Sequence, residues 1–199
     1  MVKEKKWDLI ISSKKDWFNL DLKNIWRYRD LIIFFIKRDI STEYKQTILG
    51  VFYHALNPII STIIKVIIFG KIAKLSTDGI PHFLFYLSGG IFWSYFSRCL
   101  AIGKGVFLTN RELYSQVYIP KLAVPVANNI SEFLKLIMQI LLFIGFFIYY
   151  YTNGVDLDPS ISLIFLIPLL FFQCSLLGLG FGLLLSSFTT RYRDLNFLG

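Results

Sequence analysis

The sequence predicts an all-α, polytopic integral membrane protein, in which an N-terminal amphipathic helix precedes a bundle of four transmembrane helices. Three observations predict this class. Hydrophobic residues make up 55% of the 199 residues and charged residues only 17%, against roughly 25% charged residues in an average soluble domain. Four long windows carry no charge, and Lys and Arg gather in alternate connections between them.

The charge-free windows locate the four spans. They cover residues 46–64, 79–97, 136–155 and 159–190, and a helix needs roughly 20 residues to cross the hydrocarbon core. The strands of a membrane barrel would alternate between apolar and polar residues, which these windows do not. We therefore expect transmembrane helices at about 47–70, 82–101, 124–151 and 161–188, within a membrane domain of residues 46–199.

The charge distribution predicts the orientation. Sixteen Lys and Arg residues lie before residue 46, in 103–121 and after 190, whereas two lie in 71–81 and 152–158 together. Because positive loops stay in the cytoplasm, we expect a multi-pass protein of the cytoplasmic (inner) membrane with a cytoplasmic N-terminus. Topology then explains the net charge of +8, and a nucleic-acid partner is not expected.

Residues 1–45 form the cytoplasmic N-terminal segment. From residue 21 to 45, apolar side chains alternate with basic ones, which predicts an amphipathic interface helix. Trp26, Arg29, Lys37 and Arg38 are its candidate interface residues, because bases beside an apolar run bind anionic lipid headgroups. The alternative is a surface helix of a soluble extension.

The first predicted span contains Pro58, which is expected to kink the helix, and Lys65. Lys65 either snorkels to the membrane surface or faces a water-filled path. Asp78 and Gly79 then signal a turn in the outer connection.

Aromatic residues are frequent in the second predicted span. Four are candidates for stacking on sugars, and helix packing is the alternative: Tyr86, Trp93, Tyr95 and Phe96. In the connection after this span, Thr109 and Glu112 have the spacing of a capping box, which predicts a short helix on the cytoplasmic surface.

Three further pairs of residues stand out. Glu132 and Lys135 are three residues apart in the third span, where they form either a structural ion pair or a functional group at membrane depth. Gly178 and Gly182 predict a close helix contact in the fourth span. Cys99 and Cys174 are interpreted as packing residues, without a disulfide or a metal site.

Catalytic residues, metal sites and cofactors are not expected on this chain. The sequence has no nucleotide-binding G-x-x-x-x-G-K-[ST], no zinc-binding H-E-x-x-H, no C-x-x-C pair and no G-x-S-x-G. Asp156 and Asp158 suggest an alternative, an integral-membrane enzyme of glycolipid synthesis that holds a divalent cation. Two carboxylates do not complete the oxygen shell that such a cation needs.

Several short motifs, in their order and spacing, resemble the ABC-type polysaccharide export permeases, the type-2 exporters of lipid-linked O-antigen, capsule or teichoic-acid chains. The motifs are Lys37-Arg38-Asp39, Tyr44-Lys45-Gln46-Thr47-Ile48-Leu49-Gly50, Phe69-Gly70-Lys71, Asp78-Gly79-Ile80-Pro81, Ser88-Gly89 with Trp93 and Phe96, Val117-Tyr118-Ile119-Pro120-Lys121 with Pro125, and Arg191-Tyr192-Arg193-Asp194-Leu195.

This resemblance implies a homodimer of permeases, each docked on an ATP-binding subunit that holds ATP and Mg²⁺. Two segments match the family's coupling elements: Asn110, Arg111, Glu112 and Tyr114 in the short helix, and Arg191, Tyr192, Arg193 and Asp194 near the last residue. The helix from Asp21 matches the family's interface helix, beside the entrance for the lipid-linked substrate.

The chain departs from the family pattern in two places. Glu43 stands where relatives usually have a basic residue. The family normally has six spanning helices, so a chain with four is expected to be truncated at its C-terminus. A type-2 exporter of drugs or small lipids shares the fold, and it stays open as an alternative to polysaccharide export.

Overall fold

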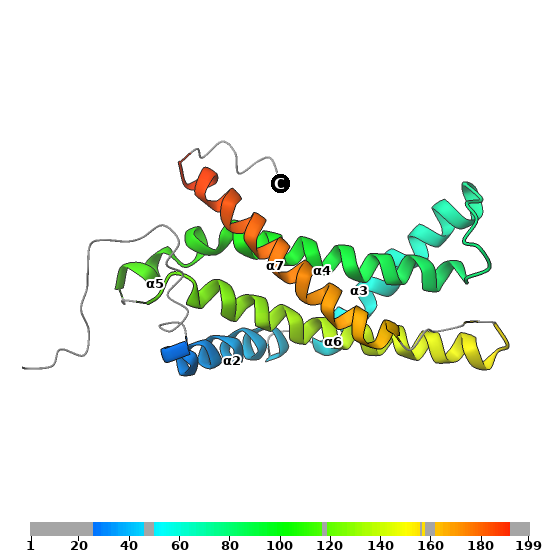
Figure 1. Ribbon diagram of the computed structural model, residues 1–199, viewed down its shortest axis with the longest axis horizontal. Coiled ribbons are helices and arrows are strands. Elements are labelled where there is room, and N and C mark those ends of the chain that lie inside the picture. Colours follow the sequence, from blue (N-terminus) through cyan, green and yellow to red (C-terminus); the bar gives the residue numbers. More distant parts are fainter. Residues whose placement is uncertain (1–25, 46–49, 117–118, 156, 158–161, 192–199) are drawn as a thin grey trace, which may run out of the picture.

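The computed structural model describes residues 26–45, 50–116, 119–155, 157 and 162–191, and the described part contains helices without any strand (Figure 1). The all-α prediction is confirmed. The elements are α2 (Arg29–Lys45), α3 (Gly50–Lys65), the π-helix η1 (Val66–Ile72), α4 (His82–Thr109), α5 (Arg111–Gln116), α6 (Ala123–Thr152) and α7 (Ser162–Arg191).

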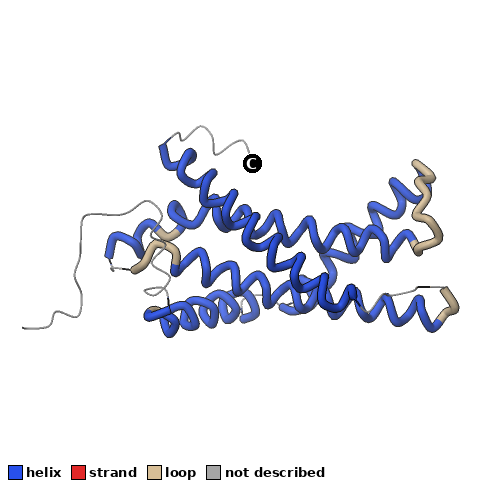
Figure 2. Tube along the Cα trace, in the orientation of Figure 1, coloured by secondary structure: helices blue, strands red, loops and turns tan. Residues whose placement is uncertain are grey.

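The long helices run back and forth between two ends of an elongated bundle. The loop from η1 to α4 and the end of α6 lie at one end, whereas α5 and the end of α7 lie at the other (Figure 1). The loops drawn in tan gather at these two ends (Figure 2). Successive connections therefore alternate between the ends, as the arrangement predicted from the charges requires.

The outer surface of the bundle is the surface of a membrane protein. Helix α6 and residues 165–188 of α7 are long and apolar enough to span a bilayer, yet only 11% and 22% of the residues in their most apolar windows are buried. Phe165, Leu169 and Phe172 are among the most exposed side chains of α7. Water would not tolerate so much uncovered apolar surface, so lipid surrounds these helices.

The other two predicted spans also form helices, with different boundaries. The 16 residues of α3, with Pro58 inside, continue without a break into the seven residues of η1. Helix α4 is 28 residues long, so the prediction that it ends near residue 101 was wrong. The reason is tertiary packing, because Gly103 and Val106 are buried beyond that point.

A set of glycines brings α4 and α7 into close contact. A Cβ atom added to Gly182 would lie 2.5 Å from the backbone oxygen of Leu100 and 2.7 Å from the Cα of Gly103. A Cβ added to Gly178 would lie 2.8 Å from the Cβ of Cys99. Only glycine permits this approach of two backbones, and the predicted contact through Gly178 and Gly182 is confirmed.

A central core joins α4, α6 and α7. Its buried members are Leu87, Ile91, Tyr95, Cys99, Leu136 and Phe171. The Phe171 ring stacks on Phe92 with 4.1 Å between ring centroids, and it meets Tyr95 edge-on at 5.7 Å. Both arrangements are favourable geometries for aromatic pairs.

Polar side chains cross-link the same three helices. The Cys99 thiol donates a hydrogen bond to Asn129 Oδ1 at 3.2 Å, and Asn129 Nδ2 donates to Ser175 Oγ at 2.8 Å. In lipid, a polar group between helices needs such a partner. Cys99 and Cys174 are both free thiols, as predicted.

A second core lies near α5 and includes the first helix. Its buried residues are Ile32, Phe35, Val106, Ile119, Ala123, Val124 and Ala127, from α2, α4, the segment before α6, and α6 itself. This packing explains why α4 extends to Thr109. Helix α2 begins at Arg29, residues 26 and 27 are also helical, and residues 21–25, where the predicted helix begins, lie outside the described part.

The two predicted turns have different outcomes. Asp78 and Gly79 form the expected turn, with φ angles of 49° and 87°. The assignment of Thr109 as an N-cap was wrong, because Thr109 is the last residue of α4. Asn110 separates α4 from α5, and its Nδ2 donates to Val106 O at 2.9 Å, which satisfies a carbonyl of the last turn of α4.

The glycine contact predicts opposite effects for two neighbouring substitutions. Gly182→Ala should destabilise the protein by about 1–3 kcal/mol, because the added methyl group meets backbone atoms of α4. Gly180→Ala is the matched control: nothing lies within 4 Å of its added Cβ, and removing a helical glycine should stabilise by about 0.5–1 kcal/mol. Thermal unfolding in detergent, followed by circular dichroism, measures both, and equal shifts would contradict the packing account.

Candidate functional site

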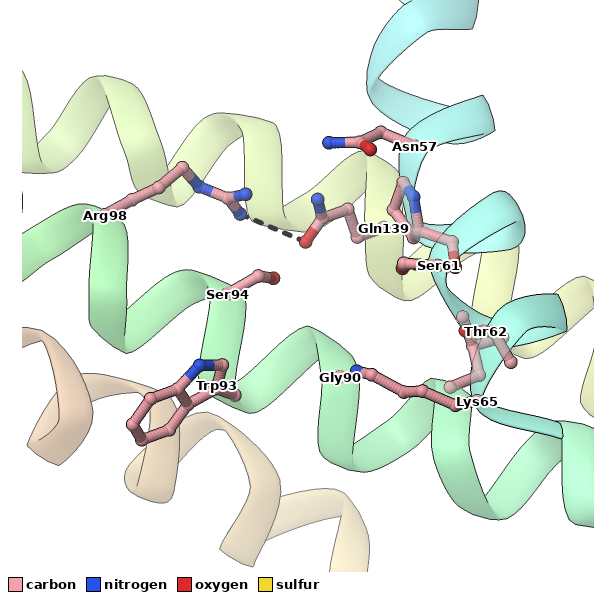
Figure 3. Close-up of a pocket in the computed structure, with 11 residues that line it drawn as sticks. Asn57, Ser61, Thr62, Lys65, Gly90, Trp93, Ser94, Arg98 and Gln139 are labelled. Atoms are coloured by element: carbon pink, nitrogen blue, oxygen red, sulfur yellow. Dashed lines mark hydrogen bonds between the residues drawn. The ribbon is translucent and has the colours of Figure 1, made fainter. Parts of the chain in front are cut away.

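A polar cavity of about 250 Å³ lies between α3, α4 and α6 (Figure 3). Polar or charged side chains from all three helices line it: Asn57, Ser61, Thr62 and Lys65 from α3, Ser94 and Arg98 from α4, and Gln139 from α6. A polar cavity within a bundle coated by lipid is unusual, because each polar group there must be satisfied by protein or water. It is the candidate functional site.

Helical periodicity places these residues on one face of each helix. Asn57, Ser61 and Lys65 follow one another at intervals of four, as do Gly90, Ser94 and Arg98. Side chains four residues apart lie on the same side of a helix. The sequences of α3 and α4 thus each supply a polar stripe, and the two stripes face each other across the cavity (Figure 3).

Lys65 extends from α3 across the cavity toward α4 (Figure 3). Its Nζ lies 3.2 Å from the position that a Cβ atom on Gly90 would occupy, and its side chain is half-buried. Glycine at position 90 therefore leaves room for the ammonium group. Of the two alternatives for Lys65, this placement favours the polar path over snorkelling.

Arg98 joins the cavity to a buried ion-pair cluster. Its Nε lies 2.9 Å from Glu132 Oε2, and its Nη2 donates a hydrogen bond to Gln139 Oε1 at 3.1 Å. Lys135 Nζ donates to the other oxygen of Glu132 at 2.6 Å. The predicted pairing of Glu132 with Lys135 is confirmed. The cluster links α4 to α6, and the pairing lowers the cost of burying its charges.

Arg98 and Gln139 were not predicted as site residues. Arg98 is the first charge after the second charge-free window, and it lies close to residue 101, where the second span was predicted to end. Because α4 continues for another eleven residues to Thr109, Arg98 lies well inside the helix. The signal was present, since an ionisable residue within a membrane helix is a functional candidate by default.

The aromatic candidates of α4 have different surroundings. Trp93 lines the cavity and is 68% exposed, and its ring lies 6.1 Å from that of Phe96. Tyr86 is half-buried, with its ring 5.9 Å from that of Phe69 in η1. Tyr95 is fully buried in the central core, so it packs between helices and cannot stack on a sugar in this structure.

The candidate coupling residues of α5 lie at the end of the bundle opposite to the loop between η1 and α4 (Figure 1). Arg111 and Glu112 are exposed. The Tyr114 hydroxyl donates a hydrogen bond to Lys121 O at 3.0 Å, and burial raises the pKa of Tyr114 to about 12. Tyr114 thus fastens α5 to the segment before α6, while the two charged side chains remain accessible.

Part of the second coupling segment lies beyond the described residues. Arg191 is the last residue of α7, and Tyr192, Arg193 and Asp194 lie outside the described part of the chain. The same holds for Asp156 and Asp158, the acidic pair of the alternative enzyme. Among the residues that the structure describes, no group of three or more His, Cys, Asp or Glu side chains is placed to hold a metal ion.

The basic residues of the predicted interface helix are on its surface. Arg29, Lys37 and Arg38 are exposed, and Trp26, just before α2, is 72% exposed. Arg38 lies over the Phe35 ring, 4.9 Å from its centroid, and it pairs with Asp39 at 2.8 Å. Ile32 and Phe35 are buried in the core near α5, so α2 has one face in the bundle and an outer face that carries these bases together with exposed apolar residues such as Phe34.

Comparison with known proteins gives relatives of one kind. Two proteins named "O-antigen export system permease protein RfbA" from Klebsiella pneumoniae are 24% and 23% identical to this chain over 167 residues, which cover 83% of the chain and 61% of each relative. A protein of the same name from Myxococcus xanthus is 26% identical over 128 residues, which cover 62% of the chain and 48% of the relative. The chain thus spans about three fifths of the length of the Klebsiella relatives.

One protein family matches most of the chain, including the three helices that line the cavity. The family described as "ABC-2 type transporter" matches residues 30–199. That range begins one residue after the start of α2 and contains α3, α4, α6 and α7 in full. This chain belongs to the ABC-2 type transporter family.

Proposed function

We propose that this chain is the transmembrane permease subunit of an ATP-driven exporter that moves a lipid-linked polysaccharide across the membrane from its cytoplasmic side. The observation that carries the proposal is the similarity, over 83% of the chain, to two permeases named for O-antigen export. The polar cavity between helices that are otherwise coated by lipid supports it. A hydrophilic polymer needs a polar surface to pass through hydrocarbon.

The residues around the cavity suit a sugar cargo. Trp93 presents an exposed ring at a cavity whose lining also includes the hydroxyl of Ser94 and the amide of Gln139. Sugars offer apolar C–H faces and many hydroxyl groups, so an aromatic ring next to hydrogen-bonding groups matches both of their surfaces. Phe96 lies next to Trp93 and extends this aromatic surface.

The energy source is expected on a separate subunit that binds ATP and Mg²⁺. The sequence of this chain carries no nucleotide-binding loop. Helix α5 offers the docking surface, because Arg111 and Glu112 are exposed there while Tyr114 fixes the helix to the bundle. We further propose a homodimer of permeases, with α5 and the segment 191–194 of each copy facing an ATP-binding subunit.

The proposed orientation places α5 and the N-terminus in the cytoplasm, in the cytoplasmic (inner) membrane. The excess of Lys and Arg in the connections on that side supports it. The exposed bases of α2, Lys37 and Arg38, then face anionic headgroups at the inner leaflet, where a lipid-linked substrate would enter.

A reconstituted transport assay tests the cargo. Proteoliposomes that contain this chain and its ATP-binding subunit should move a labelled lipid-linked polysaccharide only when ATP is supplied. A hydrophobic dye and a short-chain fluorescent phospholipid serve as comparison cargoes. ATP-dependent movement of either of these, without movement of the polysaccharide, would contradict the proposal in favour of a drug or small-lipid exporter.

Charge reversal tests the docking surface. Glu112→Lys combined with Arg111→Glu should weaken association with the ATP-binding subunit about tenfold or more, because like charges then face each other in the interface. Co-purification measures the association. Lys71→Glu, an exposed reversal in η1 near the opposite end, is the matched control and should have no effect. Equal recovery of the ATP-binding subunit with all variants would show that α5 is not part of the interface.

Cysteine labelling tests the orientation. Single cysteines at Ser76, Ser115 and Asn153, each exposed in a loop, a short helix or a helix end, are introduced into a chain in which Cys99 and Cys174 are replaced by alanine. A maleimide that cannot cross membranes should label positions 76 and 153 in intact cells, and position 115 only after permeabilisation. The reverse pattern would show that the orientation is inverted.

A further inference from the structure

The cations of the cavity between α3, α4 and α6 have no matching negative charge on its lining. Lys65 and Arg98 both line it, and no Asp or Glu is among the described residues of the lining. Glu132, the carboxylate behind Arg98, is shared between Arg98 and Lys135. The two cations therefore give the cavity a positive potential, which the low dielectric of the surrounding helices strengthens.

Lys65 is the less compensated of the two. Among the described residues, no carboxylate lies within ion-pair distance of its Nζ, whereas Arg98 has Glu132 at 2.9 Å. A half-buried ammonium group inside a membrane bundle is costly. Such a charge is retained where it binds something, and an anion is the ligand that removes the cost.

Two neutral amide donors line the same cavity as the ammonium group of Lys65. Gln139 accepts the hydrogen bond from Arg98 through its carbonyl oxygen, so its amide nitrogen remains a donor on the cavity side. Asn57 supplies a second amide from α3 (Figure 3). Donors from three different helices thus line one cavity, a composition that suits an anion with several acceptor oxygens.

We propose that this cavity binds a phosphoryl group through Lys65, Arg98 and the Gln139 amide. A volume of about 250 Å³ is smaller than the roughly 300–1,000 Å³ of sites for drug-sized ligands. It therefore holds a charged group rather than a whole chain. The identification of this group with the phosphate that links lipid to sugar rests on the proposed export function, but the binding site itself does not.

Calorimetric titration of the purified full chain in a nonionic detergent tests the site. The titrants are inorganic phosphate, dihexanoyl phosphatidic acid and, as a control without net charge, dihexanoyl phosphatidylcholine, all at constant ionic strength. Lys65→Gln should weaken phosphoryl binding about tenfold, because a charge-assisted contact is lost. Lys65→Arg should retain most of the affinity. Lys71→Gln, which removes an exposed lysine outside the cavity, should leave it unchanged.

The titrants identify the source of the group. Equal binding of both phosphates, lost in Lys65→Gln, makes the phosphoryl group alone the ligand, whereas binding of phosphatidic acid only, with the same loss, makes it a lipid headgroup. No binding by the wild-type chain, equal affinity for phosphatidylcholine, or equal affinity of Lys65→Gln and Lys71→Gln would overturn the site. Intact phosphoryl binding without ATP-driven transport would count against the export function and leave this site standing.

Discussion

The direct backbone contact between α4 and α7 determines where the other parts of the bundle lie. Gly103, Gly178 and Gly182 allow the two helices to approach so closely that a single added carbon would collide with main-chain atoms. Between transmembrane helices, where lipid removes most of the hydrophobic driving force, this kind of contact supplies van der Waals attraction that larger side chains would prevent. The remaining faces of α4 then pack against α3 and α6, and the cavity lies between these three helices.

Two sets of polar side chains inside the bundle hold one another across helices. The Cys99, Asn129 and Ser175 side chains satisfy one another across three helices, and Glu132 is held by Arg98 and Lys135. Both sets stabilise the packing because hydrocarbon offers no substitute partner. Lys65 is different, since the described part of the chain gives it a polar cavity but no carboxylate. Unlike Arg98, Glu132 and Lys135, Lys65 therefore remains available for a ligand.

The sequence predicted the bounds of the lipid-facing helices well. It was least accurate where contacts between helices determine the end of a helix. Charge-free windows located α6 and α7 to within a few residues, because a membrane span is a property of local composition. The end of α4 was predicted too early because Gly103 and Val106 lie in a stretch that was predicted to be a polar connection. Their contacts with α7 and α2 cannot be seen in the sequence.

The candidate site was only partly visible for the same reason. Lys65 and the Glu132–Lys135 pair could be found from their depth and spacing. Arg98 and Gln139 join them only in three dimensions, through contacts 34 and 41 residues apart along the chain. Tyr95 is the opposite case. The sequence suggested it as a candidate for stacking on sugars, but Phe171 and its neighbours enclose it in the core.

A single residue, Asn110, connects α5 to the 28-residue α4. Its side chain closes the last turn of α4, and its backbone oxygen accepts the Tyr114 amide of α5 at 3.1 Å. These two hydrogen bonds fix the position of α5 relative to the end of α4. At 1.5 Å per residue, α4 is a helix about 42 Å long, with α5 at one end and the crossing with α7 between its two ends. Because the backbone contacts with α7 begin at Phe96, a small tilt of α4 about this crossing moves Trp93 in the direction opposite to α5, whereas Arg98 lies at the crossing and moves little.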